Sequence, residues 1–406
     1  MERSRSVILW LLLVMSHLME YFSFVAPCLL TPLNVPFKPC ERTKKLPLTM
    51  NNSINPRSAL TRRSFLHIVA LAGLVSAAGA TRFFPFSPNA PRLLTVRKSF
   101  PLMGTQLNLT VYSQDRDQAE AAITAMISRM QGLEGKLSRH QQTSEVATLN
   151  RTGSLDRPSQ ELRTVLELAD TIHRQTAGAF DITVLPLLTL YQQHKEQLRS
   201  QPALIQSLVR NIGQEQLHLT SSQVRLDSKG TAKNVEDTVG NAGNLGITLD
   251  GIGKGYIVDQ GVATLKSFGF QQVLVEAGGD LLVSGSKPQG APWRIGIRKP
   301  RPEMPGALLT VSGDDMAVAT SGDYFQPFSP DLLSHHIINP KTGFSPPELA
   351  SCTITAPNAA LADALATGCM VLGKADSVDL LAGMPGCEGL FIGKDLKVQK
   401  TDGFAS

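Results

Sequence analysis

The sequence predicts an α+β protein in which helices pack against mixed or antiparallel sheets. Strand-like and helix-like segments follow one another in irregular order, without the regular alternation that builds a parallel sheet. No internal repeat is visible, which argues against a solenoid or a propeller. The 406 residues are 42% hydrophobic and 18% charged, a composition typical of a globular chain and not of a collagen-like or disordered one.

Periodicity predicts the elements of the first half of the globular region. Alternating polar and apolar residues predict strands, and apolar residues at a spacing of three and four predict helices. On these grounds we expect two strands within 92–112 that break at Met103-Gly104, helices at 115–137, 162–175 and 201–212, and a hairpin at 217–226.

The second half follows a polar, glycine-rich and asparagine-rich stretch at 227–246, which we expect to be a surface loop or insertion. The same periodicities then predict a helix at 253–268, strands at 273–275, 281–284 and 293–297, a buried Ala-rich helix at 359–372, and closing strands within 390–399.

Residues 61–80 resemble a bacterial twin-arginine export signal. Arg62 and Arg63 precede an apolar run that ends in an Ala-Gly-Ala sequence at 78–80, which is typical of signal-peptidase cleavage. A buried or membrane-spanning helix is the alternative, but the run is shorter than the roughly 18–20 apolar residues that a membrane span needs.

The export signal defines the expected organisation of the chain. Residues 1–49 precede Met50, an alternative start, and we interpret them as an extension from a wrongly assigned start codon; a second targeting element is the alternative. We expect the signal at 50–80, a tether at 81–94 and one domain at 95–400. The protein would then lie in the periplasm or another oxidising, extracytoplasmic compartment, with its signal cleaved or kept as an inner-membrane anchor.

Charge and cysteine content argue against two kinds of site. The net charge of +5 is mild and no dense basic block occurs, so we expect no nucleic-acid partner. Only Cys352, Cys369 and Cys387 lie beyond the export signal, and none belongs to a CxxC pair. A zinc site or a disulfide scaffold is therefore not expected.

Glycine-rich segments hold the polar residues that could contact an anion. Residues 250–256 place three glycines around Lys254 before a predicted helix, which suits phosphate binding; an ordinary tight turn is the alternative. Residues 276–280 fit either a hairpin turn or a backbone packed on a flat ligand. The polar segments 319–324 and 336–343 fit surface loops as well as functional sites.

Asp363 and Thr367 are polar residues in an otherwise apolar helical segment. Their spacing of four places them on one helix face. A carboxylate among Ala and Leu is costly to bury unless it is paired or binds a cation, and oxygen ligands of this kind suit Mg²⁺. The alternative is structural: Asp363 caps a neighbour and Thr367 bonds within its own helix.

Together these segments resemble the ApbE family, the FAD:protein FMN transferases. The resemblance covers about 95–400 and rests on nine motifs that occur in the family's order. The first three motifs are Met103-Gly104-Thr105, the stretch 137–150 with its LSRH segment and its SE and LN pairs, and the GAFDIT segment at 178–183. The other six are residues 249–256, 275–281, 293–297, 317–324, 336–343 and 356–373.

The resemblance implies an α+β fold related to the T-fold and an enzyme that uses Mg²⁺ and FAD. Family members cleave FAD, join its FMN phosphate to a threonine hydroxyl of a target redox protein, and release AMP. The implied Mg²⁺ ligands are Asp363, Thr367 and the backbone carbonyl of Gly251. The implied FAD contacts are Met103, His140, Ala179, Phe180, Asp181, Thr248, Lys254, Gly278, Gly279 and Ile337.

The residue that removes the proton of the acceptor hydroxyl stays open at this stage. Candidates are His336, Asp323 and Asp181, in no order, because a general base is defined by its distance to the hydroxyl.

The sequence departs from the family pattern mostly around the expected flavin contacts. Thr248 stands where the family has aspartate, Asp250 where it has glycine or serine, Gly253 where it has alanine, His140 where it has an aromatic residue, and Asn339 where it has aspartate. We therefore expect weaker FAD binding or an altered choice of acceptor. The two alternative functions are an FAD pyrophosphatase that yields FMN and AMP, and a non-catalytic flavin-binding protein.

Overall fold

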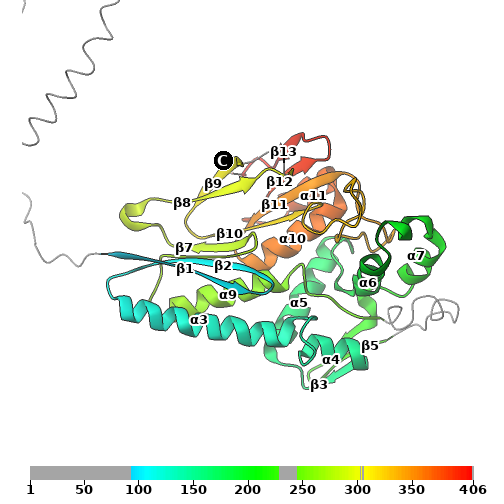
Figure 1. The fold of residues 1–406 in the computed structure, drawn as a ribbon, viewed down its shortest axis with the longest axis horizontal. Coiled ribbons are helices and arrows are strands. Elements are labelled where there is room, and N and C mark those ends of the chain that lie inside the picture. The colour runs from blue at the N-terminus through cyan, green and yellow to red at the C-terminus, as the bar shows by residue number, and fades with distance from the viewer. Residues whose placement is uncertain (1–92, 228–244, 302, 304–305, 405–406) are drawn as a thin grey trace, which may run out of the picture. The chain divides into compact units, whose positions relative to one another are not determined.

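An eight-stranded antiparallel sheet forms the centre of the protein, as the computed structural model shows (Figure 1). The structure describes residues 93–227, 245–301, 303 and 306–404. The predicted export signal, the N-terminal extension and nearly all of the polar insertion lie outside these residues. Among the helices that the structure describes, none is both long and apolar enough to cross a membrane.

The strands of the large sheet come from widely separated parts of the chain. Their spatial order is β1-β2-β6-β7-β10-β11-β12-β13, and every neighbouring pair is antiparallel. The strands are β1 (Leu94–Leu102), β2 (Thr105–Ser113), β6 (Val273–Ala277), β7 (Asp280–Ser284), β10 (Met316–Gly322), β11 (Leu349–Ala356), β12 (Glu388–Gly393) and β13 (Val398–Lys400).

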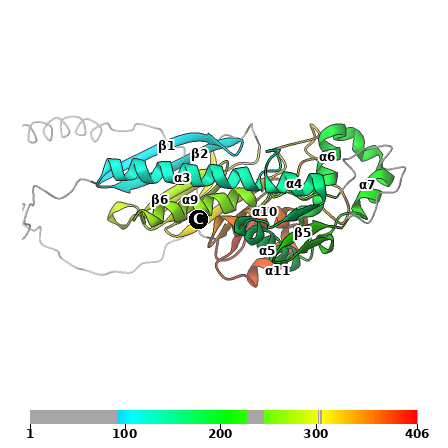
Figure 2. The same cartoon turned by 90° about the horizontal axis from the view of Figure 1, so that it is seen from below.

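Helices cover one face of this sheet and a two-stranded ribbon covers the other (Figures 1 and 2). Three helices lie on successive strand pairs: α3 (Arg116–Leu137) on β1–β2, α9 (Gly253–Ser267) on β6–β7 and α10 (Ala359–Leu372) on β10–β11. Helix α11 (Lys374–Ala382) lies on β12. The ribbon, β8 (Trp293–Arg298) with β9 (Ala307–Gly313), buries its apolar side chains against β7, β10 and β12.

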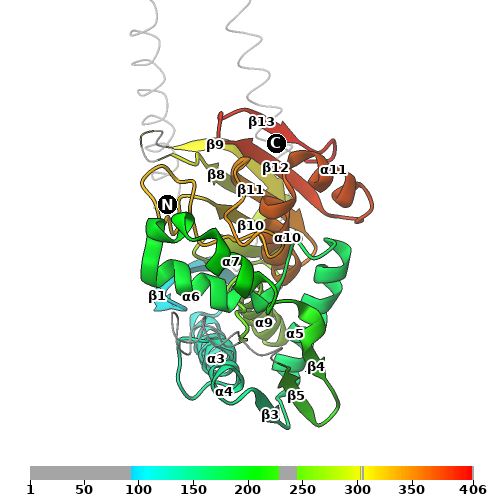
Figure 3. The ribbon, with the colours of Figure 1, turned by 90° about the vertical axis from the view of Figure 1, so that its right-hand side faces the viewer.

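The remaining elements form the end of the molecule beside α10. They are α4 (Glu145–Thr152), α5 (Gln160–Gln175), α6 (Leu185–His194), α7 (Pro202–Val209) and a small sheet of β3 (Ser154–Asp156), β5 (Gln223–Leu226) and β4 (Leu217–Leu219). Figure 3 shows α6 and α7 next to the segment that joins β10 to β11. A second apolar cluster, centred on Tyr191, holds these parts together.

Local sequence accounts for the longest helix, which confirms the predicted one at 115–137. Asp115 caps α3, and its carboxylate accepts hydrogen bonds from the N–H groups of Asp117 and Gln118. Met126, Met130 and the other apolar residues at helical spacing are buried, and Met126 and Met130 lie next to Gly261 of α9. The predicted helices at 253–268 and 359–372 are also present, as α9 and α10.

Several predicted boundaries are wrong. The helix predicted at 201–212 is α7, which ends at Val209. Beyond that end, the carbonyl of Asn211 accepts a hydrogen bond from the side-chain amide of Gln216. The segment 319–324, for which a surface loop was one of two alternatives, lies mostly in β10. Strands β3 and β9 to β11 and helices α4, α6 and α11 were not predicted. All eight residues of β11 are buried, so it lacks the alternation that marks a half-exposed strand.

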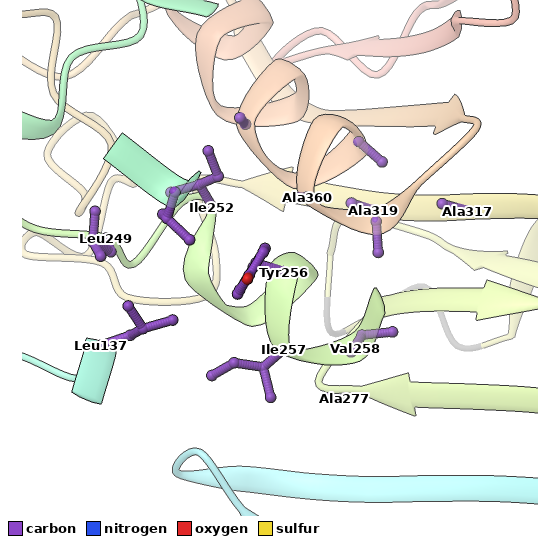
Figure 4. Close-up of a cluster of buried hydrophobic side chains, with 14 of the residues drawn as sticks. Leu137, Leu249, Ile252, Tyr256, Ile257, Val258, Ala277, Ala317, Ala319 and Ala360 are labelled. Atoms are coloured by element: carbon purple, nitrogen blue, oxygen red, sulfur yellow. The ribbon is translucent and has the colours of Figure 1, made fainter. Parts of the chain in front are cut away.

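Helices α9 and α10 cross closely at Gly255. A Cβ on Gly255 would lie 2.2 Å from the carbonyl oxygen of Ala359, so only glycine allows this contact. Figure 4 shows the surrounding core, with Ile252 and Tyr256 of the α9 region grouped near Ala360 of α10. The crossing fixes the start of α9 against the first turn of α10.

Replacement of Gly255 tests this contact. We expect Gly255→Ala to lower the free energy of unfolding by about 1–3 kcal/mol, because the new methyl group forces the two helices apart. Gly132→Ala is the matched control: nothing lies within 4 Å of its added Cβ in α3, so we expect it to stabilise by roughly 0.5–1 kcal/mol. Urea unfolding measures both, and equal effects would contradict a close-contact role for Gly255.

Candidate active site

The candidate site lies at the end of the large sheet where two hairpin turns meet. Met103-Gly104 joins β1 to β2, and Gly278-Gly279 joins β6 to β7. All four residues have positive φ, which a two-residue type I′ turn requires. The turns are neighbours because β2 pairs with β6. A Cβ on Gly278 would lie 2.7 Å from Oγ1 of Thr105, so the close approach also needs glycine.

The glycine-rich loop before α9 connects three of the predicted motifs. Thr248 donates its backbone N–H to the carbonyl of Ile182 at 2.7 Å, which ties the loop to the GAFDIT segment. The loop then packs on α10, since a Cβ on Gly251 would lie 2.8 Å from Oγ1 of Thr367. Predicted site residues from distant parts of the chain are therefore brought together here.

Lys254 stands in the first turn of α9 within a group of carboxylates. Its Nζ forms an ion pair and hydrogen bond with the buried carboxylate of Asp280, at the start of β7. Burial by itself would lower the pKa of Lys254, but the nearby charges of Asp280, Asp363 and Asp250 outweigh it and raise the pKa above its usual value. Lys254 is therefore a fixed cation at this end of the sheet.

Asp363 is buried in α10, on the face that the sequence predicted. Its Oδ2 accepts the backbone N–H of Gly255 at 3.2 Å, which caps the start of α9. Burial raises the pKa of Asp363 to about 8, and the charge of Asp280 adds to this increase. One turn later, Oγ1 of Thr367 lies 3.3 Å from Oγ of Ser321 in β10.

Asp181 belongs to a separate polar group beside the site. Its Oδ1 accepts hydrogen bonds from the N–H and Oγ1 of Thr183, at 2.8 and 2.6 Å, and its Oδ2 lies 3.5 Å from Nδ1 of His173. Burial raises the pKa of Asp181. The neighbouring residues Ala179 and Phe180 are buried, and Phe180 packs beside Gly368 of α10.

His336 faces the glycine-rich loop with a neutral ring. Burial lowers the pKa of His336 to about 4, while the charges of Asp250 and Lys254 act on it in opposite directions. Its Nδ1 is buried without a hydrogen-bond partner, and its backbone N–H donates to the carbonyl of Gln326 at 3.1 Å. At neutral pH the ring is therefore uncharged. The next residue, Ile337, is part of the main apolar core.

Asp323 is fully buried and paired with two cations. Arg301 donates two hydrogen bonds to its carboxylate, at 2.8 and 3.1 Å, and Nζ of Lys394 lies 3.6 Å from its Oδ2. Both carboxylate oxygens are therefore engaged in holding the end of β10. This arrangement is typical of a structural carboxylate.

His140 is exposed, and its neighbour Arg139 makes the contact to the site. The Nε of Arg139 lies 2.9 Å from Oδ2 of Asp250, so the turn after α3 is tied to the glycine-rich loop. Arg139, Asp280 and Ser321 were not among the predicted site residues. Asp280 lies in a segment whose turn was predicted, but its partner Lys254 is 26 residues away, and no local pattern links the two.

Comparison with known proteins agrees with this arrangement. The model of the ApbE family matches residues 103–391, which is most of the chain. The chain belongs to the ApbE family. It is 32% identical over 320 residues to a protein of Treponema pallidum named FAD:protein FMN transferase, covering 74% of this chain and 85% of that protein. A protein of the same name from Vibrio cholerae is 29% identical over 317 residues, covering 76% and 87%.

Solved ApbE structures share the fold. The flavin transferase ApbE from Vibrio cholerae aligns with a TM-score of 0.62 and 28% identity, over 77% of this chain and 99% of that one. The ApbE protein of Thermotoga maritima aligns with a TM-score of 0.64 and 26% identity, over 77% and 97%. The α+β class predicted from the sequence, with antiparallel strands packed on helices, is therefore confirmed.

The implied Mg²⁺ site of this ApbE protein has a suitable donor set. Asp363 supplies a buried carboxylate with a raised pKa, which is the signature of a negative charge that lacks full compensation. The hydroxyl of Thr367 and the backbone of Gly251 lie beside each other. No group of three His, Cys, Asp or Glu residues suited to a metal occurs among the described residues. A site with one carboxylate and neutral oxygens fits Mg²⁺, which keeps several waters or phosphate oxygens.

Metal binding at Asp363 predicts a pH-dependent stabilisation. We expect Mg²⁺ at 100 times its Kd to stabilise the protein by about 2.7 kcal/mol. A proton competes for a carboxyl whose pKa is raised to about 8, so Mg²⁺ affinity should rise with pH up to that region. Asp363→Asn should remove the shift in Tm with Mg²⁺, although its amide oxygen can still cap Gly255.

Asp259→Asn is the matched control for this measurement. Asp259 is also a carboxylate of the α9–α10 crossing, and it accepts the N–H groups of Ala359 and Ala360. The control should keep the Mg²⁺-dependent Tm shift. A shift that survives in Asp363→Asn would show that the metal binds elsewhere.

Proposed function

We propose that this protein is a Mg²⁺-dependent FAD:protein FMN transferase that joins FMN to a threonine hydroxyl of a target redox protein and releases AMP. Its relatives carry the name of this activity. The observation that carries the proposal is the position of Asp363: a buried carboxylate on the same helix face as Thr367, beside the fixed cation Lys254. Storage of flavin alone would not need such a group.

The residues of the chain account for binding and orientation of FAD. Asp363, Thr367 and Gly251 would hold Mg²⁺, which when bound neutralises phosphate charge and polarises the pyrophosphate. Lys254 provides a second positive charge that Asp280 keeps in place, so little reorganisation is needed as charge develops. We place the flavin near the turn at Gly278-Gly279.

His336 is the best of the three candidates for the general base. In the reaction the acceptor oxygen bonds to the FMN phosphorus, the bond from that phosphorus to the AMP oxygen breaks, and the acceptor proton must move to a base. Nδ1 of His336 is neutral and has no partner. The carboxylates of Asp323 and Asp181 are engaged by Arg301 and Thr183, respectively.

Export by the twin-arginine route is a second part of the proposal. The signal at 61–80 supports it, and that route carries folded proteins, which suits a protein that binds its cofactor before export. The acceptor would then be an exported or membrane-bound redox protein. We expect the protein in the periplasmic fraction, with an N-terminus near Thr81 or, if the signal is kept, attached to the inner membrane. N-terminal sequencing after fractionation measures this, and a cytoplasmic protein with an intact N-terminus would contradict it.

The transfer reaction itself is tested with the purified protein, FAD, Mg²⁺ and an acceptor domain that carries a target threonine. We expect a fluorescent acceptor band on a denaturing gel that disappears with EDTA. His336→Gln should lower the transfer rate about 10²–10⁴-fold and leave FAD binding unchanged, because a general base contributes a factor of this size.

The products distinguish the possible outcomes. Release of FMN and AMP with no labelled acceptor would assign the protein as an FAD pyrophosphatase. Bound FAD without any product would leave a flavin-binding protein. An unchanged transfer rate in His336→Gln would exclude this histidine as the base.

A further inference from the structure

Arg139 and Asp250 form an ion pair between two segments that are far apart in the sequence. Nε of Arg139, in the turn after α3, lies 2.9 Å from Oδ2 of Asp250 in the glycine-rich loop. The side chain of Arg139 is only 12% exposed, whereas that of Asp250 is 46% exposed. A charged group that is mostly withdrawn from water is costly unless it is paired, so Asp250 accounts for the position of the Arg139 guanidinium.

The carboxylate of Asp250 lies where several elements of the candidate site meet. The next residue of the loop packs against α10, and its backbone is an implied Mg²⁺ ligand. Burial has the largest effect on the pKa values of Lys254, Asp363 and His336, and the negative charge of the Asp250 carboxylate raises all three. If this carboxylate were unpaired, its charge would also act on the phosphates of a bound FAD and repel them.

The neighbouring carboxylates already have other partners. Lys254 pairs with the buried carboxylate of Asp280. Asp363 is the group proposed to hold Mg²⁺. The carboxylate of Asp250 then remains, and Arg139 is the cation that pairs with it.

Hydrogen bonds elsewhere fix the backbone of the glycine-rich loop. Nδ2 of Asn150, in α4, donates to the carbonyl of Ile247 at 2.8 Å, and its Oδ1 accepts the N–H of the same residue at 2.7 Å. The next N–H, that of Thr248, bonds the carbonyl of Ile182. The loop is thus held without the ion pair, and the contribution that remains for Arg139 is its charge.

We propose that Arg139 is a positioning residue for FAD binding, which neutralises the Asp250 carboxylate so that the FAD phosphates can approach Lys254 and the Mg²⁺ site. The inference rests on the proposed function, because it takes FAD to bind beside Lys254 and Asp363. Arg139 acts through Asp250 and needs no contact of its own with FAD.

The opposite charges of FAD and Mg²⁺ separate a charge effect from a structural one. Mg²⁺ is titrated into the protein, and FAD into the Mg²⁺-saturated protein without acceptor, both by calorimetry. We expect Arg139→Gln to lower FAD affinity about five-fold and to raise Mg²⁺ affinity by a similar factor, since it leaves a partly exposed charge unpaired. Both changes should shrink in about 1 M salt, where the Debye length is about 3 Å.

Three further variants complete the test. Arg139→Lys keeps the charge and should bind FAD as the wild type does. Adding Asp250→Asn to Arg139→Gln removes the unpaired charge and should restore FAD affinity to within about two-fold of the wild type. Lys98→Gln is the matched control: Lys98 lies 3.0 Å from Glu120 near the opposite end of α3, and its variant should bind both ligands normally.

Several results would overturn the proposal. An unchanged FAD affinity in Arg139→Gln would do so. So would a loss of FAD and Mg²⁺ affinity together that Asp250→Asn does not restore, because the pair would then be a structural tether. A wild type that shows the expected pattern of binding but transfers no FMN would support the role of Arg139 and refute the transferase function. A wild type that binds no FAD would overturn both.

Discussion

The candidate site depends on the crossing of α9 and α10, where each helix uses a carboxylate to bind the free N–H groups at the start of the other. Asp259 of α9 accepts the N–H groups of Ala359 and Ala360, at 2.7 and 2.9 Å, and Asp363 of α10 accepts that of Gly255. The two helix starts therefore lie together, and their positive dipole ends favour anions at one place. The absence of a side chain at Gly255 makes the crossing close enough for both bonds.

This crossing explains how a costly carboxylate is kept in the core. Asp363 has one N–H donor and the nearby charge of Lys254, which is shared with Asp280. That is less compensation than Asp323 receives from two bonds to Arg301 and a nearby lysine. Both oxygens of the Asp323 carboxylate already pair with cations, whereas the carboxylate of Asp363 can still bind one. The difference in pairing separates the two roles better than burial, since both side chains are buried.

The antiparallel sheet supplies the other half of the site. Its register places the turns at Met103-Gly104 and Gly278-Gly279 side by side, and it brings Ser321 of β10 against Thr367. The segment between β10 and β11 leaves the same end of the sheet and comes back at His336. The two turns, Thr367 and His336 are thus positioned by one framework, which suits a reaction that must align two substrates.

Local patterns in the sequence determined the positions of α3, α9 and α10, both hairpin turns and the shared face of Asp363 and Thr367, because helical spacing and turn chemistry involve residues only a few positions apart. The order of motifs also indicated the family. Tertiary structure alone decided that Lys254 pairs with Asp280 and that Asp323 is occupied by cations from other segments. It also decided the fully buried strand β11, which has no alternation to detect. Pairing across the fold depends on how the elements pack, and no local period in the sequence encodes it.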